Sequence, residues 1–331
     1  MAIFSDVFVD VTRYGTKIPQ EDYLPAGLYQ IIDQGQNEIA GYSNNPDGLF
    51  TDVPAIIFGD HTRVLKYVDK PLFLGADGVK LLKAKDENAN YKYLYYALCS
   101  VRIPDTGYNR HFKWLKEAEI PLPDANAQAQ IAAVLDNVNA SIALRKRQLV
   151  KLDELVKARF VEMFGDPAQA ENKWQVSTFG DEFYITSGGT PNTKNPAYWE
   201  HGTIPWIGSN MCQDKIVFQN DGKHITKEGL AHSSAKVFES GTVLVALVGA
   251  TIGKTALLRF ATATNQNVAA IDVNANKDFT SEYVYYHLQF LYPKFQELGN
   301  GTFKMANQTF IRALPILCPP YELQVEFSDF M

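Results

Sequence analysis

The sequence predicts an α+β protein made of two similar domains that are joined by a long coiled-coil-type helix. Three observations lead to this fold class: a set of motifs occurs twice, a long helical segment without proline or glycine separates the two copies, and each copy mixes short β-rich runs with helices. The chain has 331 residues, which suffices for two domains of about 150 residues and a connector.

The repeat is clearest in one aromatic motif. The run Tyr93-Leu94-Tyr95-Tyr96-Ala97-Leu98 returns 190 residues later as Tyr283-Val284-Tyr285-Tyr286-His287-Leu288. Other landmarks recur in the same order: an apolar run at 56–59 and 243–249, Phe-Lys at 112–113 and 303–304, and an apolar, proline-containing exit at 120–123 and 316–320 followed by Gln128 and Gln324. This period is too long for a solenoid, so each copy is predicted to be a whole domain.

The connector has the pattern of a coiled coil. Residues 127–163 contain no proline and no glycine, and apolar residues recur at heptad spacing and between those positions: Ile131, Leu135, Val138, Ile142, Leu149, Leu152, Val156 and Met163. Arg145 and Arg159 interrupt this seam. A helix of this length would extend roughly 55 Å. The alternative is an ordinary core helix of one large domain.

The predicted boundaries follow from these features. We expect a first domain at 1–123, a helical spacer at 124–165, a second domain at 166–318, and the start of a second spacer helix at 319–331. In the first domain we expect strands at 28–33, 55–58, 64–68 and 79–82 and helices at 91–100 and 112–118. In the second we expect strands at 204–207, 242–248, 255–260 and 268–273 and a helix at 280–291.

Composition narrows the class of protein. An apolar content of 46% supports folded cores, and neither a membrane-length apolar run nor a signal peptide is present, which favours a cytoplasmic protein that does not bind membranes. The three cysteines lie far apart, so the sequence offers no metal site. The net charge of −6 argues against nucleic-acid binding unless basic side chains cluster on one face of a domain.

Catalytic motifs are not found. The segment 249–255 resembles a phosphate-binding P-loop, but it has three rather than four residues between its glycines, and a strand-like run follows where a helix is required. The sequence contains no GxGxxG, GxSxG or HExxH motif. Two interpretations remain for Asp60, His61 and Asp77: they could form a catalytic set, or they could equally be turn residues after a strand. Tyr93, Tyr95 and Tyr96 could stack on bases, but aromatic residues at helical spacing more often form the core.

Polar and glycine-rich segments surround the predicted strands. Such side chains read base edges and bind phosphates, although they are also ordinary loop residues. The DNA-binding candidates of the first domain are Tyr14, Lys17, Gln34, Gln36, Asn37, His61, Thr62, Arg63, Tyr108, Asn109, Arg110 and His111. Those of the second domain are Ser187, Gly189, Thr190, Ser209, Asn210, Thr251, Lys254, Asn265, Gln266 and Lys304. We expect Arg63 and Lys254 to contact phosphates.

Several motifs together resemble one family. The segments 128–136, 145–148 and 152–157 and the ending 160–167 closely resemble the spacer of specificity subunits of type I restriction-modification systems. The segments 14–17, 32–35 and 58–62 look like one variety of target recognition domain, and 187–191, 206–209 and 248–255 look like another. The resemblance covers essentially the whole chain and explains the incomplete P-loop as a family motif.

The resemblance implies a non-catalytic DNA-recognition subunit. Each domain would read one half of a bipartite target in double-stranded DNA, and the spacer would set the gap and dock modification subunits. No cofactor is expected on this chain. Modification subunits would bring S-adenosylmethionine and flip the target adenine, and a restriction subunit would bring ATP and Mg for translocation and cleavage.

The chain departs from the family at its second spacer. Aligning Gln324 with Gln128 places Met331 opposite Leu135, so about 28 residues of the equivalent helix have no counterpart. We therefore expect a shortened subunit whose exposed seam associates with another copy or with a partner subunit.

Two other classes of protein are the alternatives. A stand-alone DNA-modifying enzyme would require a cosubstrate loop or a carboxylate cluster. A two-domain carbohydrate- or peptide-binding protein would share the repeat and the aromatics, but it would not require a charged coiled-coil spacer.

Overall fold

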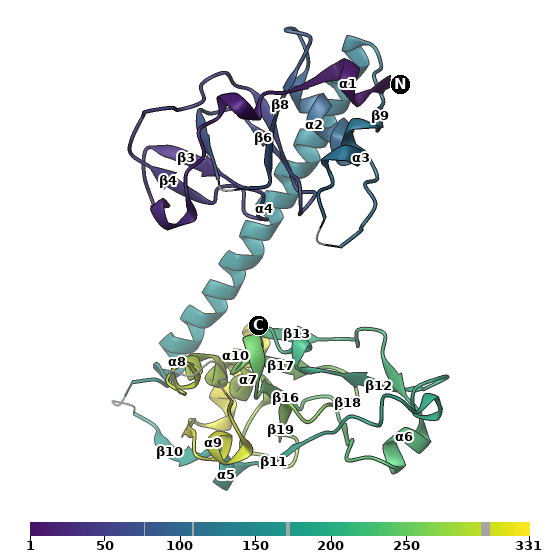
Figure 1. Ribbon diagram of the computed structural model, residues 1–331. Helices are drawn as coiled ribbons and strands as arrows, with labels where there is room; N and C mark the ends of the chain where they lie inside the picture. The colour runs from purple at the N-terminus through teal and green to yellow at the C-terminus, as the bar shows by residue number, and fades with distance from the viewer. Residues whose placement is uncertain (76, 108, 170–172, 299–304) are drawn as a thin grey trace. The chain divides into compact units, whose positions relative to one another are not determined.

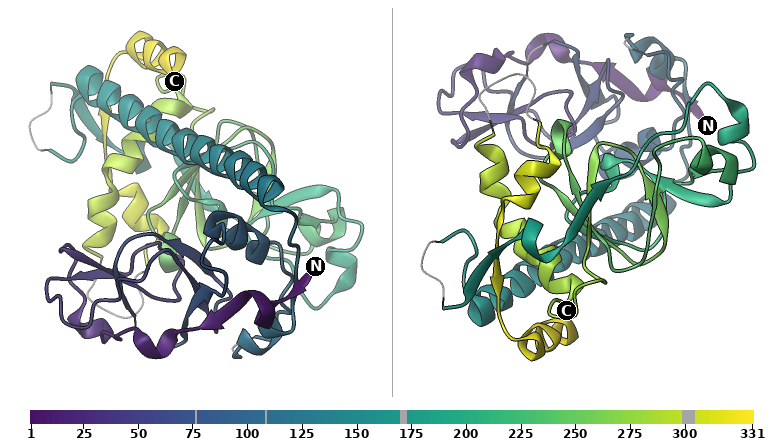
Figure 2. Two further views of the ribbon diagram at one scale, coloured as in Figure 1. Left: turned by 90° about the horizontal axis from the view of Figure 1, so that it is seen from above. Right: turned by 90° about the horizontal axis from the view of Figure 1, so that it is seen from below.

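The computed structural model describes residues 1–331 except 76, 108, 170–172 and 299–304. The chain divides into two compact units, unit 1 (Met1–Arg147) and unit 2 (Gln148–Met331). The long helix α4 (Ala125–Phe164) contributes its first part to unit 1 and its last part to unit 2, and it is drawn as one unbroken helix in Figures 1 and 2.

Unit 1 is built on a four-stranded and a three-stranded sheet. Their strand orders are β2-β8-β5-β6 and β4-β3-β7, and a separate antiparallel pair joins β1 to β9. The strands are β1 (Ala2–Ile3), β2 (Phe8–Asp10), β3 (Tyr29–Ile32), β4 (Gly41–Ser43), β5 (Ala55–Gly59), β6 (Leu65–Val68), β7 (Leu72–Leu74), β8 (Val79–Ala84) and β9 (Glu119–Ile120). The helices are α1 (Phe4–Val7), α2 (Tyr91–Cys99) and α3 (Phe112–Lys116), with two 3-10 turns at η1 (Thr12–Tyr14) and η2 (Gln20–Asp22).

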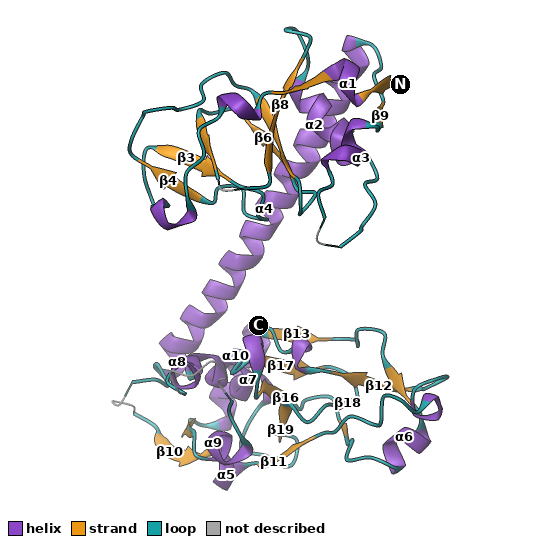
Figure 3. Cartoon of the chain, viewed as in Figure 1, coloured by secondary structure: helices purple, strands orange, loops and turns teal. Residues whose placement is uncertain are grey.

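The sequence explains which strand is central in unit 1. All five residues of β5 are buried, and the strand pairs with β6 on one side and β8 on the other. A continuous apolar run is expected for a strand that is covered on both faces. In Figure 3 the helices α1, α2 and α3 gather beside the first part of α4, whereas β3 and β4 lie on the opposite side of the unit.

Unit 2 repeats this plan with additional elements. Its sheets have the orders β11-β19-β16-β17-β13 and β14-β12-β18-β15, and β10 pairs with β20. The strands are β10 (Gln175–Thr178), β11 (Tyr184–Ser187), β12 (Ile204–Ile207), β13 (Lys215–Val217), β14 (His224–Ile225), β15 (Val237–Phe238), β16 (Val243–Ala246), β17 (Thr255–Leu258), β18 (Thr262–Thr264), β19 (Val268–Asp272) and β20 (Pro315–Cys318). The helices are α5 (Phe179–Glu182), α6 (Lys227–Ala231), α7 (Ser281–Phe290), α8 (Tyr292–Gln296), α9 (Gln308–Arg312) and α10 (Tyr321–Phe330), with 3-10 turns at η3 (Pro196–Tyr198), η4 (Ser209–Met211) and η5 (Gly249–Thr251).

The two units correspond in detail. The hydroxyl of Tyr93 donates to the carbonyl of Pro121 at 2.7 Å, and the hydroxyl of Tyr283 donates to the carbonyl of Leu317 at 2.8 Å. Each bond ties the helix of the repeated aromatic motif to the exit of its domain. The predicted repeat and the α+β class are therefore confirmed.

The exit of each domain is also closed in the same way. Gln128 donates from Nε2 to the carbonyl of Pro123 at 2.8 Å, and Gln324 donates from Nε2 to the carbonyl of Pro319 at 3.0 Å. Gln128 and Gln324 therefore hold equivalent positions at the start of α4 and the start of α10, as expected from the sequence.

The spacer helix is as long as predicted, but each of its ends contributes side chains to the core of one unit. Ala132 is buried in the core of unit 1, and Phe160, Met163 and Phe164 are buried in the core of unit 2. Residues 137–155 are all exposed. Of the predicted seam, Val138, Ile142, Leu149 and Leu152 are therefore exposed, as is Ile131, whereas Leu135 and Val156 are half-buried and Met163 is buried.

Two further expectations concern the segments around the aromatic motif and the incomplete P-loop. Tyr93 is buried, as expected of a core residue, whereas Tyr95 and Tyr96 are half-buried. Strand β17 follows the 3-10 turn η5 at the position where a P-loop would continue into a helix. Within the described residues, no helix is both long enough and apolar enough to span a bilayer.

Candidate functional site

Three loops of each unit lie at equivalent positions of the fold. In unit 1 the parallel strands β3 and β7 are followed by residues 33–36 and by residues 75 and 77, and the loop of the hairpin between β5 and β6 spans 60–64. In unit 2 the parallel strands β12 and β18 are followed by residues 208–210 and 265–267, and the loop of the hairpin between β16 and β17 spans 247–254. Carboxyl ends of parallel strands meet at one edge of a sheet, where ligands commonly bind.

Gln34 connects these loops in unit 1. Its Nε2 donates to the carbonyl of Asp77 at 3.0 Å, and its Oε1 accepts from the backbone N–H of His61 at 3.1 Å. The hydroxyl of Thr62 donates to the carbonyl of Gln34 at 2.6 Å. The Nδ1 of His61 lies 3.2 Å from the carbonyl of Asn109. The structure therefore brings Gln34, His61, Thr62 and Asn109 together.

Two cations of this edge, Lys17 and Arg63, are paired with carboxylates. Lys17 lies 3.0 Å from Asp77, and Arg63 lies 2.8 Å from Asp105. The hydrogen bond from Lys17 lowers the pKa of Asp77, and the positive charge of Arg110 contributes in the same direction. Arg63 has φ of 64°, a left-handed backbone conformation that is uncommon for a residue other than glycine. Positive charge is present at this edge, but the nearby carboxylates compensate it.

His111 has a different environment from the other candidates. Its side chain is fully buried, its backbone N–H donates to the carbonyl of Asp60 at 2.7 Å, and its Nδ1 lies 3.0 Å from the same oxygen. The carboxylate of Asp60 accepts from the N–H of Phe112 at 2.7 Å. Asp60 and His111 thus attach the hairpin 60–64 to the start of α3, which gives both residues a role in the fold.

Unit 2 has a corresponding polar network. The hydroxyl of Thr190 donates to Oε1 of Gln266 at 2.8 Å, and Thr251 donates to the carbonyl of Ser209 at 3.3 Å. A Cβ atom at Gly208 would lie 2.8 Å from Oδ1 of Asn210 and 3.3 Å from Nδ2 of Asn265. The predicted residues of these loops therefore form one neighbourhood.

Gly189 shows why a glycine is required beside this network. A Cβ atom there would lie 2.0 Å from the hydroxyl of Ser234, and the carbonyl of Gly189 accepts from the indole N–H of Trp206 at 3.1 Å. The preceding Ser187 accepts a bond of 3.0 Å from Gln308.

Lys254 is held by a carboxylate in the same manner as Arg63. Its Nζ lies 2.5 Å from Asp214, and this hydrogen bond raises the pKa of Lys254. Asp214 also accepts from the backbone N–H of Thr255 at 2.9 Å. The ammonium group lies 4.5 Å from the centre of the Tyr292 ring.

The remaining candidates lie elsewhere or outside the described residues. Tyr14 is exposed on η1 under the guanidinium of Arg13. The carbonyl of Asn37 accepts from Lys66 at 2.6 Å, and Gln36 lines a hollow of about 720 Å³ that reaches α2 and α4. Tyr108 and Lys304 lie outside the described residues.

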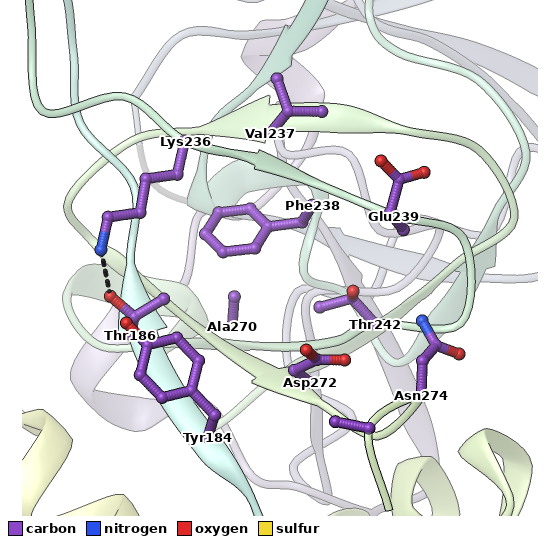
Figure 4. A pocket seen from close by; sticks show the side chains of 11 residues that line it. Tyr184, Thr186, Lys236, Val237, Phe238, Glu239, Thr242, Ala270, Asp272 and Asn274 are labelled. Carbon is purple, nitrogen blue, oxygen red and sulfur yellow. Dashed lines mark hydrogen bonds between the residues drawn. The ribbon is translucent and has the colours of Figure 1, made fainter.

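A second hollow was not predicted from the sequence. It has a volume of about 470 Å³ and lies in unit 2 on the face of β11 and β19, with Tyr184 and Asp272 at its side (Figure 4). Lys236 donates across it to the hydroxyl of Thr186 at 2.8 Å. Tyr184 is 61% exposed, so an aromatic surface borders this hollow. An exposed tyrosine alternating with a buried isoleucine on β11 was the available signal.

Sequence reasoning also missed the acidic partners. Asp77, Asp105 and Asp214 each hold one predicted DNA-binding cation, and they come from distant segments of the chain. No cluster of three or more histidine, cysteine or acidic side chains suited to a metal ion occurs in the described residues.

The fold and these edges define a class of protein: two repeated α+β modules, each with a polar loop edge, joined through one long helix. The model of the type I restriction modification DNA specificity domain matches this chain twice, at residues 5–154 and 171–331. The chain belongs to this family and contains two recognition domains, so the predicted resemblance is confirmed. Specificity subunits are the non-catalytic components of type I systems.

Two curated relatives are described as specificity subunits of type I restriction enzymes. The specificity subunit of the Escherichia coli type I restriction enzyme EcoR124I/EcoR124II is 25% identical over 305 residues, covering 84% of this chain and 72% of the relative. A putative type I specificity subunit, MjaX, from Methanocaldococcus jannaschii is 26% identical over 347 residues, covering 97% of this chain and 76% of the relative.

Solved structures share the fold. The specificity subunit from M. genitalium superposes with a TM-score of 0.58 at 18% identity, covering 99% of this chain and 87% of that chain. A chain from a study of complex assembly and conformational transition of the type I restriction-modification system gives a TM-score of 0.51 at 18% identity, covering 99% and 88%.

Proposed function

We propose that this chain is the sequence-recognition subunit of a type I restriction-modification complex and that each unit reads one half of a split target in double-stranded DNA. The observation that carries this proposal is the repetition of the polar edge: the same three loops carry polar side chains in unit 1 and in unit 2. Amide and hydroxyl groups at such edges can exchange hydrogen bonds with base edges in the major groove.

The chemistry would be supplied by partner subunits. Modification subunits would bring S-adenosylmethionine and a pocket for the flipped adenine, and a restriction subunit would bring ATP and Mg. The exposed part of α4, with Val138, Ile142, Leu149 and Leu152, would dock modification subunits and fix the gap between the half-sites. Such a complex would work in the cytoplasm, where chromosomal DNA is accessible.

Phosphate contacts would involve an exchange of ionic partners. Arg63 and Lys254 are each bound to a carboxylate in the free chain, so a DNA phosphate would replace Asp105 or Asp214 as the partner. Because each cation is already paired, a phosphate would gain less from it than from an unpaired cation, whatever the DNA sequence. This arrangement would reduce the sequence-independent part of the binding free energy.

The experiment is a methylome. The chain is expressed with its neighbouring modification subunit, and host DNA is sequenced by a method that detects N6-methyladenine. We expect a split motif with a fixed gap. Asn109→Ala should relax one half of the motif, and Gln266→Ala should relax the other half.

Two results would contradict the proposal. One is methylation at a continuous motif whose entire sequence changes when either Asn109 or Gln266 is replaced. The other is binding of the target by the assembled complex that does not weaken with salt, since phosphate contacts make affinity fall steeply with ionic strength. Methylation by the purified chain alone would instead support a stand-alone enzyme.

A further inference from the structure

The two units differ at one edge of their larger sheets. The strands β2-β8-β5-β6 of unit 1 correspond to β11-β19-β16-β17 of unit 2 in order and in antiparallel pairing. Unit 2 adds a fifth strand, β13, which pairs in parallel with β17. Within the described residues, no strand pairs with the outer edge of β6, the counterpart of β17. Unit 1 therefore has an open sheet edge where unit 2 has a closed one.

The length of one loop accounts for this difference. In unit 2 the strands β12 and β14 are separated by residues 208–223, and β13 forms inside this loop. In unit 1 the corresponding strands β3 and β4 are separated by residues 33–40, which is half as many. A loop of this length reaches at most about 28 Å when fully extended. It is too short to join β3 to β4 and also to lay a strand along β6.

The main chain of β6 has hydrogen-bonding groups that are directed to this edge. The N–H of Gly59 donates to the carbonyl of Val64 at 2.8 Å, and in an antiparallel pair every second residue faces the neighbouring strand. Leu65 and Tyr67 therefore direct their N–H and C=O groups away from β5. In the part of the chain that the structure describes, no hydrogen bond satisfies these groups. Such an edge can accept another strand.

The hairpins establish which residues of β6 and β17 are equivalent. The N–H of Ala246 donates to the carbonyl of Lys254 at 2.9 Å, as the N–H of Gly59 does to the carbonyl of Val64. Residue 64 thus corresponds to residue 254, and this offset of 190 residues is also that of the aromatic motif. The same offset therefore aligns the two strands and the helices that follow them.

The outward groups of β17 are bonded to β13 and to the residue before it. The carbonyl of Thr255, the counterpart of Leu65, accepts from the N–H of Asp214 at 2.8 Å. The N–H of Arg259 donates to the carbonyl of Val217 at 2.9 Å. The edge of β6 thus presents the main-chain pattern that holds an additional strand in unit 2.

A hollow of about 720 Å³ lies along this edge. All residues from Val64 to Lys70 line it, so it follows the whole of β6. One wall belongs to α2 and α4 and includes Lys92, Tyr95 and Lys146, whereas the other belongs to β3 and the loop after it and includes Ile32, Glu38 and Ile39. The first of these is called the basic wall below.

Tyr67 faces the basic wall. Its ring lies 6.3 Å from that of Tyr95, and Nζ of Lys92 lies 4.2 Å from the centre of the Tyr67 ring. Lys92 also lies 3.5 Å from Asp136, whereas Lys146 forms no ion pair with a carboxylate among the described residues. A residue of an added strand beside Tyr67 would therefore meet an excess of positive charge.

Val68, the next residue of β6, faces the other wall. It packs in one cluster with Ile32 and Ile39. Successive side chains of a strand point to opposite faces. The two neighbours of the residue beside Tyr67 would therefore meet these isoleucines, and the hollow fits a strand whose side chains alternate between apolar and acidic.

We propose that the open edge of β6 is a docking site for an extended segment of a partner protein, which adds a fifth strand to the sheet and alternates apolar with acidic side chains. The main-chain groups of Leu65 and Tyr67 supply the hydrogen bonds, and Lys92 and Lys146 supply the preference for acidic residues. The inference rests on the comparison of the two units and does not depend on DNA recognition.

The test uses the full-length chain and a fluorescent peptide, TVEVEVT, whose binding is measured by fluorescence anisotropy. We expect micromolar binding that the lysine version, TVKVKVT, does not show. Two further peptides carry N-methyl groups, one on its glutamates and the other on its valines. Because alternate N–H groups of a strand face opposite edges, only one of these two peptides should lose binding.

Tyr67→Pro tests the main-chain bonds from the side of the chain. Proline removes the outward N–H of this residue, and it is tolerated in an edge strand at such a position. The matched control is Tyr67→Val, which also lacks the ring but keeps the N–H. We expect Tyr67→Pro to bind the peptide about tenfold or more weakly than Tyr67→Val, because a hydrogen bond to the peptide is lost.

Lys146→Glu tests the charge without altering the sheet, because Lys146 is exposed on α4. It should weaken binding of TVEVEVT about fivefold or more by like-charge repulsion, whereas Lys151→Glu, an exposed position of α4 outside the hollow, should bind normally. Equal binding of both N-methylated peptides would overturn the proposal, as would equal binding by Tyr67→Pro and Tyr67→Val.

Two results would identify a different occupant and contradict the proposal. If a non-specific DNA duplex displaces the peptide and binds less tightly to Lys146→Glu but equally to the two Tyr67 variants, the hollow is a phosphate site. If the chain without peptide is a dimer that Tyr67→Pro, but not Tyr67→Val, converts to a monomer, the occupant is a second copy of this chain.

Discussion

Replacing Phe160 by alanine should destabilise unit 2 strongly and leave unit 1 unchanged. The side chain is completely buried among five aromatic rings, from α7 and α10. Removing a buried phenylalanine costs the transfer free energy of its ring and leaves a cavity, and the sum is typically about 3–5 kcal/mol. The rigid aromatic surroundings cannot collapse easily into the space, so we expect the upper half of that range.

Denaturant unfolding followed by tryptophan fluorescence measures this effect, because three of the four tryptophans lie in unit 2. Leu149→Ala is the matched control: this residue lies on the same helix but is 66% exposed, and surface substitutions rarely change stability by more than about 1 kcal/mol. A loss below about 1 kcal/mol for Phe160→Ala would refute the conclusion that the end of α4 is part of the core of unit 2. An equal loss in unit 1, followed through a probe placed there, would refute the independence of the two units.

Three further predictions concern buried polar groups and the loop edge. Gln324→Ala should lower the unfolding free energy of unit 2 by about 2–4 kcal/mol, because the side chain of Gln324 is buried and makes three hydrogen bonds. Gln128→Ala removes one hydrogen bond at a half-buried site and should lower the unfolding free energy by less than about 1 kcal/mol. Denaturant titration measures both changes. Burial lowers the pKa of His287 to about 3, so between about pH 6.5 and 3 this residue is protonated only in the unfolded state. On acidification through this range, His287 should lower the unfolding free energy of unit 2 by about 1.4 kcal/mol per pH unit. A stability–pH curve of His287→Gln with the same slope as the wild type would contradict this. Arg63→Ala should weaken binding to all DNA sequences alike and lower the salt slope by about one, whereas Asp105→Asn should strengthen binding to all sequences; a changed preference at one base would contradict the phosphate assignment.

The sequence predicts the architecture well because local sequence patterns determine where the helices and strands form. The aromatic motif, the heptads and the apolar runs each fix one element, and the observed bounds of α2, α7, β5 and β12 differ from the expected ones by at most about a residue. The repeat then adds tertiary information, since two copies of the same element order predict two similar folds. The start of a helix that the sequence predicts at 319–331 is observed as α10.

The site is predicted less completely because it depends on contacts between distant segments. The polar loops could be recognised by composition, but nothing in the local sequence indicates that Lys17, Arg63 and Lys254 each pair with a carboxylate 40 or more residues away. For the same reason His111 resembles a loop histidine in the sequence, although the fold buries it against Asp60. The periodicity of α4 likewise predicts a continuous seam, whereas the cores of the two units cover its ends.

The exposed middle of α4 has a consequence for recombination between the genes of two such chains. Each unit keeps its own piece of the helix, ending near Asn139 on one side and beginning near Val156 on the other. A genetic crossover within residues 137–155 would join two foreign halves without separating any buried side chain from its core. Recombination at this point can therefore produce a folded chain with a new pair of recognition domains in a single step, whereas a crossover before Ala132 or after Phe160 would separate one of these buried side chains from its core.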